Sequence, residues 1–137
     1  MNPPILDQSE KVIFWIENDI LFCRFNQSDC YLSAANAKTY VSQVEEIIKG
    51  KRLPCIIDVR KFIGNFSLTA AKIFTKSSII KNITVHAFVA DTINAKLLIA
   101  SYNRLYLKAT HFHVFEKMET AIEFSIQSKN TSDADKY

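Results

Sequence analysis

The residues best placed for chemistry lie at and after the end of one apolar run. Residues 53–59 are almost entirely apolar up to Asp58, which predicts a short buried strand that ends in a carboxylate. A loop follows, and Ser67 then stands where its hydroxyl can cap a new helix. In parallel sheets, ligands and partners gather at the carboxyl ends of strands and the amino ends of the following helices. We therefore expect the functional surface around Asp58 and Ser67.

Two further strand ends carry polar residues, Asp91-Thr92 and Glu116-Lys117. An acid, a hydroxyl and a lysine at successive strand ends, here Asp58, Thr92 and Lys117, resemble the phosphoacceptor site of receiver domains. That chemistry also requires an acidic pair after the first strand to hold Mg²⁺. The chain has a predicted hairpin at that point and no acidic pair. A receiver-like phosphorylated aspartate is therefore only our third hypothesis, and we do not predict an enzyme.

The other reactive residue types do not form a complete catalytic or metal-binding set. His111 and His113 alternate along one predicted strand and His86 lies on the neighbouring one, but no further ligand stands at a supporting spacing. Ser67 lacks the Gly-x-Ser-x-Gly elbow of hydrolases, which favours its role as a helix cap. With only 2 Gly, the chain has no glycine-rich phosphate loop. We predict no catalytic residue, no metal and no cofactor.

Composition restricts the class of protein. The chain has 137 residues, of which 48% are hydrophobic and 23% charged, as in an ordinary globular domain. Its net charge of +3 is too small to indicate nucleic-acid binding. No stretch approaches the roughly 20 apolar residues of a membrane span. The three cysteines, Cys23, Cys30 and Cys55, are odd in number and have no metal spacing. We expect a soluble cytoplasmic protein that binds neither nucleic acid nor membrane.

Periodicity predicts an α/β fold with the element order β-β-α-β-α-β-α-β-α. Asn18-Asp19 is a turn pair between two β-prone runs, which indicates an N-terminal antiparallel hairpin. Strands that alternate with helices afterwards require parallel pairing, so the central sheet is expected to be mostly parallel. The predicted strands are residues 11–17, 20–25, 53–59, 82–90 and 110–116, and the four predicted helices are residues 33–49, 67–78, 93–107 and 118–127.

One domain over residues 11–127 is expected, between an extension at 1–10 and a polar, disordered tail at 128–137. In the helix predicted at 33–49, one apolar stripe faces the sheet, and Gly50 ends the helix. The stripe comprises Ala37, Val41, Val44 and Ile48.

The helix predicted at 93–107 has two apolar stripes, although a helix needs only one to dock on its sheet. The first comprises Ile93, Leu97, Leu98, Ser101 and Leu105, and the second comprises Ala95, Ile99, Tyr102 and Tyr106. Two interpretations stay open for the second stripe. Either neighbouring helices cover it, or Ile99, Tyr102 and Tyr106 form an exposed patch suited to a homodimer or another partner.

The element order, with strand-Asp-loop-Ser-helix in the middle, resembles STAS domains, the anti-sigma-factor antagonist fold. The closing stretch at residues 112–124, a strand ending in Phe followed by an acidic helix, also looks like that family. The resemblance is closest to small stand-alone bacterial STAS-like proteins. It implies a phosphorylatable serine at the start of the second helix, in an Asp-Ser-Ser-Gly context. Here that stretch reads Asn65-Phe66-Ser67-Leu68, so the Asp and the Gly are missing.

Our leading hypothesis is a non-enzymatic, cytoplasmic, STAS-like regulatory module that binds a protein partner, with a role in partner switching. Ser67 and Thr69 are the candidate phosphorylation sites, because a helix amino end stabilises added negative charge. The alternative is a carrier or sensor of a small apolar ligand, with a pocket lined by Phe and Tyr side chains. The predicted partner-binding residues are Asp58, Asn65, Phe66, Ser67, Asp91 and Thr92.

Overall fold

The computed structural model describes residues 12–25, 31–60, 65–66, 69, 72–73, 76, 81–106 and 112–134. Its main sheet begins with a hairpin of β1 (Val12–Glu17) and β2 (Ile20–Phe25). Asn18 and Asp19 between them have φ angles of 54° and 59°. Positive φ at both central residues is typical of the turn whose twist matches that of two antiparallel strands. The predicted hairpin is confirmed.

Three parallel strands complete the five-stranded sheet, in the order β1-β2-β4-β6-β7. They are β4 (Leu53–Asp58), β6 (Ile83–Val89) and β7 (Phe112–Phe115). Each pairs with its neighbour in the parallel sense, β4 with both β2 and β6, and β6 with β7. The predicted mixed sheet is therefore confirmed. A short parallel pair of β3 (Tyr31–Leu32) and β5 (Asn65–Phe66) was not predicted, because two-residue strands leave no periodicity in a sequence.

Helix α1 (Ala34–Ile48) has clear end signals. The Ser33 hydroxyl accepts a hydrogen bond from the backbone N–H of Asn36 at 3.2 Å, and the Asn36 side chain accepts one from the backbone N–H of Ser33 at 3.1 Å. Lys49 and Gly50 then adopt positive φ and end the helix. The buried face consists of Ala37, Tyr40, Val44 and Ile48. Tyr40 replaces Val41 of the predicted stripe, and Val41 is only half-buried.

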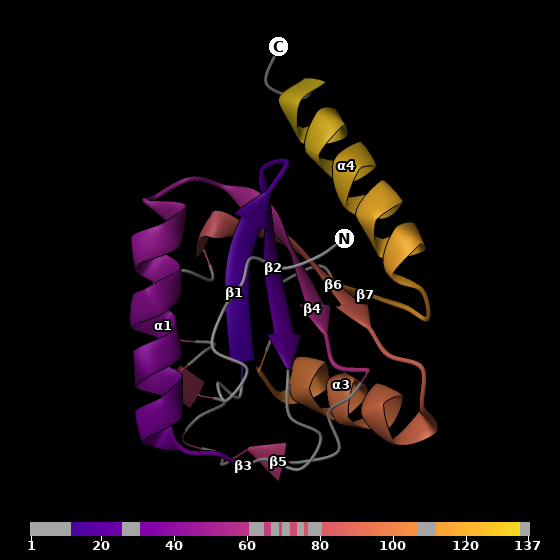
Figure 1. The fold of residues 1–137 in the computed structure, drawn as a ribbon. Helices are drawn as coiled ribbons and strands as arrows, with labels where there is room; N and C mark the ends of the chain where they lie inside the picture. Colours follow the sequence, from indigo (N-terminus) through magenta and orange to yellow (C-terminus); the bar gives the residue numbers. More distant parts are fainter. Residues whose placement is uncertain are drawn as a thin grey trace.

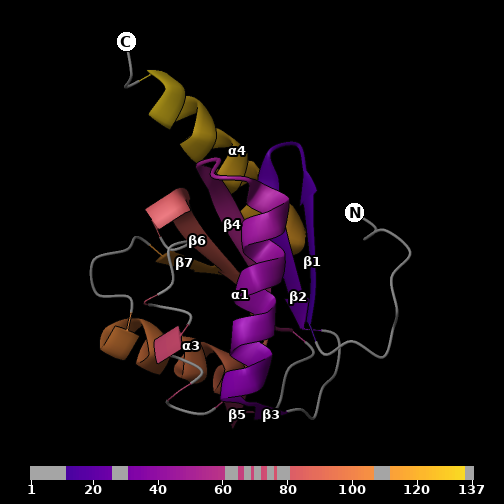
Figure 2. The ribbon, with the colours of Figure 1, turned by 90° about the vertical axis from the view of Figure 1, so that its left-hand side faces the viewer.

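The helices lie on both faces of the sheet (Figure 1). Helix α1 packs on one face, where Val44 and Ile48 join Leu21 and Cys55 in the core. Helix α4 (Met118–Ala134) packs on the other face, where Met118 belongs to a core cluster with alternate strand residues. The strand residues of that cluster are Ile13, Trp15, Ile20, Phe22, Ile56, Ala87 and Val89. Seen from the side, α1 stands in front of the sheet and α4 behind it (Figure 2).

Two of the helix predictions are not confirmed as made. One has the wrong end, and the other lies mostly outside the described residues. Helix α4 continues to Ala134, so the predicted end at Gln127 is too early and residues 128–134 are helical. The helix predicted at 67–78 lies mostly outside the described residues, of which 69, 72–73 and 76 have helical backbone. The described part of the chain thus contains three complete helices, and the predicted count of four is not confirmed.

Helix α3 (Ile93–Tyr106) packs on the core through Ala95 and Ile99, which belong to the second predicted stripe. Ala95 and Ile99 are buried in the core cluster that contains Tyr40 and Phe88. Ile93 and Leu97 of the first stripe are 76% and 61% exposed. Ile99 therefore cannot belong to an exposed dimer patch, whereas Ile93 and Leu97 of the other stripe are exposed. Two apolar stripes of similar strength left this rotation undetermined by the sequence.

The buried His86 makes stability depend on pH. Burial lowers its pKa from 6.5 to about 4, and no partner for its Nδ1 is found among the described residues. The unfolded chain therefore binds more protons than the folded one between these values, so stability falls as pH drops. We expect a loss of about 3 kcal/mol between pH 6.5 and pH 4, and a flatter profile for His86→Leu. Urea unfolding at several pH values across this range measures the change in the free energy of unfolding.

His113 provides the matched control, because its side chain is exposed. His113→Leu should keep the pH slope of the native protein. An equal slope in the His86→Leu protein would show that another group titrates.

Candidate functional site

The carboxyl ends of β2, β4, β6 and β7 meet at one edge of the sheet, called the carboxyl edge below. This follows from their parallel pairing. The amino end of α3 lies at the same edge (Figure 1). The edge therefore brings together the strand-end residues Asp58, Asp91-Thr92 and Glu116, as the sequence predicted.

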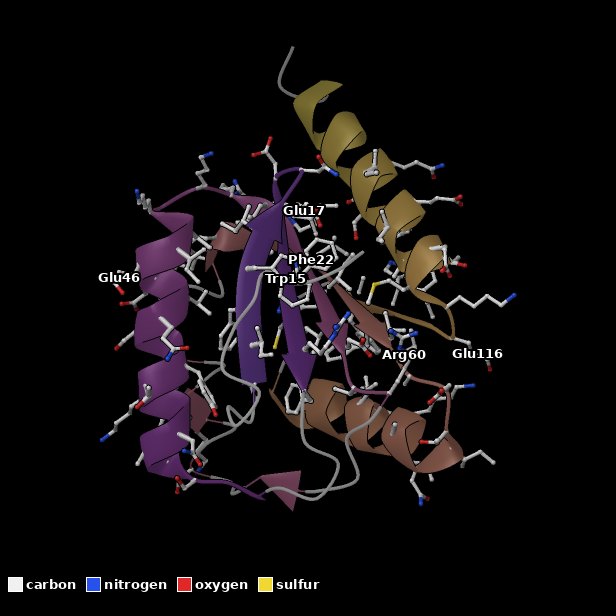
Figure 3. The ribbon with its side chains drawn as sticks, viewed as in Figure 1. Trp15, Glu17, Phe22, Glu46, Arg60 and Glu116 are labelled. Atoms are coloured by element: carbon white, nitrogen blue, oxygen red, sulfur yellow. The ribbon has the colours of Figure 1, made fainter. Side chains whose placement is uncertain are left out.

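Asp58 is buried and bound by Arg60, the second residue after β4. The Arg60 guanidinium donates through Nε to Oδ1 at 2.9 Å and through Nη2 to Oδ2 at 2.8 Å. The backbone N–H of Arg60 also donates to Oδ1 at 3.1 Å. Such a two-pronged contact is the strongest geometry available to an arginine and a carboxylate. Both oxygens of Asp58 are therefore occupied. Arg60 is labelled in Figure 3.

A second arginine, Arg24 on β2, reaches the same carboxylate. Its Nε lies 3.6 Å from Oδ2 of Asp58, because the register places Arg24 opposite Asp58. The guanidinium also lies over the Trp15 ring, 5.4 Å from its centroid, and Trp15 stacks on Phe22 at 5.1 Å. We refer to Arg24, Asp58 and Arg60 as the Asp58 cluster.

The Asp58 cluster keeps the carboxylate ionised. Burial raises the pKa of Asp58, but the hydrogen bonds and charge of Arg60 and the charge of Arg24 together lower it below its ordinary value. An ionised carboxylate with both oxygens bound is poorly presented for attack on a phosphoryl group. The geometry thus gives Asp58 a structural role between two strands.

The amino end of α3 offers the accessible polar groups of the carboxyl edge. The Thr92 hydroxyl accepts a hydrogen bond from the backbone N–H of Ala95 at 3.1 Å and so caps the amino end of α3. Asp91 and Thr92 are both exposed. Lys96 on α3 donates to Oε1 of Glu116, which ties this helix to the end of β7.

The other predicted site residues are only partly placed. Asn65 and Phe66 form β5, which pairs with Tyr31 and Leu32 rather than with the main sheet. Thr69 is exposed, whereas Ser67 lies outside the described residues. The side chains of Tyr102 and Tyr106 also lie outside the description, although both residues belong to α3.

The histidines and cysteines that the structure describes do not gather into one site. His86 stacks near Phe88 on the α1 face, whereas His113 packs against Phe124 of α4 on the opposite face. His111 and Cys30 lie outside the described residues. Cys23 and Cys55 are buried, and burial raises the pKa of Cys55 to about 12. In the part of the chain that the structure describes, no three His, Cys, Asp or Glu side chains are grouped to bind a metal.

Sequence reasoning missed Arg24 and Arg60 as partners of Asp58. The Arg60 signal was available, since an arginine two residues after a strand-end aspartate can fold back onto it. Arg24 could be found only from the register between β2 and β4, and the sequence alone does not specify this register.

Comparison with known proteins identifies the family. The model of a family described as "Domain of unknown function (DUF7793)" matches residues 14–129. The chain belongs to this family. No curated protein matches it.

A solved structure shows the same fold. It is that of an uncharacterized protein of the DUF3478 family from Shewanella loihica PV-4, described as having a SpoIIAA-like fold. The two chains superpose with a TM-score of 0.60 at 17% identity, over 83% of this chain and 91% of the other. The predicted STAS-like fold is confirmed. Among the helices that the structure describes, none is long and apolar enough to cross a membrane.

The Asp58 cluster yields a stability prediction. Arg60→Met keeps most of the apolar stem but leaves a buried carboxylate with Arg24 alone. We expect a loss on the order of 2 kcal/mol at pH 7, less than for a fully buried pair because Arg60 is one-third exposed. The loss should shrink as pH falls below the ordinary range of an aspartate, because protonation of Asp58 removes the charge attraction that Arg60 supplies in the native protein. Urea unfolding at several pH values measures both effects.

Lys51→Met is the matched control. Lys51 forms an exposed pair with Asp19 at 3.8 Å. Its removal should change stability by less than about 0.5 kcal/mol. Equal losses in the two variants would contradict a special role for the Asp58 cluster.

Proposed function

We propose that this chain is a non-enzymatic, cytoplasmic, STAS-like regulatory module that binds a protein partner at the carboxyl edge. The binding surface is the outer side of the first turns of α3, formed by Asp91, Thr92, Ile93 and Leu97. We call it the α3 surface. The accessible apolar pair Ile93 and Leu97 is the observation that carries the proposal.

Ile93 and Leu97 are large side chains that the monomer leaves in water. They are four residues apart on one helix, so they lie on the same face as neighbours. Adjacent Asp91, Thr92 and the Lys96–Glu116 pair supply a polar border. An apolar centre with a polar rim is the usual anatomy of a protein interface.

The polar groups that could be reactive are already hydrogen-bonded within the protein, which favours a binding role over catalysis. Both oxygens of Asp58 bind Arg60, and the Thr92 hydroxyl caps α3. A receiver-like site would need that carboxylate free beside a cation. The proposal therefore assigns Asp58 to holding the carboxyl edge in place, and assigns recognition to its neighbours.

Control by phosphorylation is part of the proposal. Thr69 has helical backbone and an exposed side chain, and Ser67 precedes it by two positions. A phosphate there would add about two negative charges, which would weaken the binding of an acidic partner or strengthen the binding of a basic one.

Quantitative affinity capture in cells of the source organism tests the α3 surface. Ile93→Asp combined with Leu97→Asp places two charges in the apolar centre. For at least one protein captured by the native chain, we expect the captured amount to fall at least about tenfold with this variant. The reason is that the core of an interface carries most of its binding energy.

Ile126→Asp is the control, because Ile126 is an exposed apolar residue of α4, far along the chain from the α3 surface. It should retain the captured protein. The proposal fails if both variants lose it equally, or if neither changes the captured set. Circular dichroism checks that each variant is folded.

A further inference from the structure

The two edge strands of the main sheet differ sharply in how they are covered. On β1, Val12, Ile13 and Trp15 are all buried. On β7, no residue is buried, although the strand reads Phe-His-Val-Phe. Phe112 is 39% exposed and Val114 is 38% exposed. Natural edge strands are protected by shortness, charge, proline or cover; β7 is short, with 4 residues, but it contains neither a charged residue nor a proline.

The exposed apolar side chains of β7 lie on one face of the sheet, whereas the side chains on its other face pack against α4. Phe112 and Val114 face the side of α3, where Phe112 contacts Phe88 edge-on. His113 and Phe115 face α4, where both rings pack against Phe124 with centroids 4.3 and 5.3 Å away. A strand laid alongside β7 would place its own side chains beside the exposed Phe112 and Val114.

The backbone of β7 also offers hydrogen bonds to such a strand. The Phe115 carbonyl accepts a bond from the backbone N–H of Ala90, so this residue points towards β6. Residues alternate along a strand, so Phe112 and Val114 direct their N–H and C=O groups to the outer edge. In the described part of the chain, no strand pairs with that edge.

We infer that β7 pairs antiparallel with β7 of a second copy of this chain, which joins two sheets into one of ten strands. A twofold axis perpendicular to the sheet relates the copies, so each face keeps its side. The pairing is centred on His113. Phe112 of each copy then lies opposite Val114 of the other, and the two His113 residues lie opposite each other. This surface is separate from the α3 surface and does not rest on its function.

This register suits the strand for three reasons. The outward groups of Phe112 and Val114 form two hydrogen-bonded pairs across the axis, which give four backbone hydrogen bonds. The two exposed apolar side chains of each copy cover those of the other. No residue of β7 carries a fixed charge, so no like charges meet across the strand pair.

The small interface area indicates that the dimer is weak. Four paired residues bury only a few hundred Å² per copy, at or below the lower end of specific interfaces. We therefore expect a reversible dimer with a dissociation constant on the order of 10 µM.

Sedimentation equilibrium of the full chain, between roughly 1 and 200 µM, measures this dimer. Val114→Lys places a charge at an already exposed position, and should weaken dimerisation at least about tenfold. Ile126→Lys is matched to it, since Ile126 is 40% exposed on α4, and should leave the dimer unchanged. A monomer over the whole range overturns the inference. So does a dimer that survives Val114→Lys or that Ile126→Lys disrupts equally.

Disulfide cross-linking tests the register. In a Cys30→Ser background, His113→Cys brings two thiols together across the axis, where Cα atoms of such a pair are about 4.5 Å apart. Oxidised glutathione should convert this variant to a covalent dimer, and should cross-link Val114→Cys far less. Preferential cross-linking of Val114→Cys, or of neither variant, would contradict pairing centred on His113.

Discussion

The placement of the carboxyl edge depends on one buried carboxylate. Asp58 ends the central strand β4, and its two oxygens bind Arg60 while Arg24 approaches from β2. A buried carboxylate without these partners would be costly, so the two arginines and the strand ends must keep their relative positions. The contact also brings Arg24 over Trp15, which belongs to the core cluster beneath α4. Charge at the edge and apolar packing in the core therefore support each other.

Much of this architecture could be predicted because local rules agree with the fold. Asn18 and Asp19 adopt the positive φ that a tight hairpin needs, and Ser33 and Thr92 cap helices that begin close to their predicted starts. The strand ends at Asp58 and Asp91 meet because parallel strands bring their carboxyl ends to one edge. These features depend on short stretches of sequence, or on the single rule that alternating strands and helices pair in parallel.

The failures concern choices made at longer range. Helix α3 has two apolar stripes, and only contact with Tyr40 and Phe88 decides that Ala95 and Ile99 turn inward. The partnership of Arg24 with Asp58 depends on strand register, which no local pattern shows. Helix α4 runs past a polar stretch that by composition reads as a tail. In the first two cases, contacts between elements far apart in the sequence decide what no local pattern shows.

The position of α4 in the chain has a consequence for synthesis and folding. Its residues Met118 and Ala121 complete the cluster on Trp15 and Phe22, which lie in the first hairpin. On a ribosome, that apolar sheet face must wait for almost the whole chain to emerge before its cover arrives. The closure is the most non-local event in this fold, and non-local contacts slow folding.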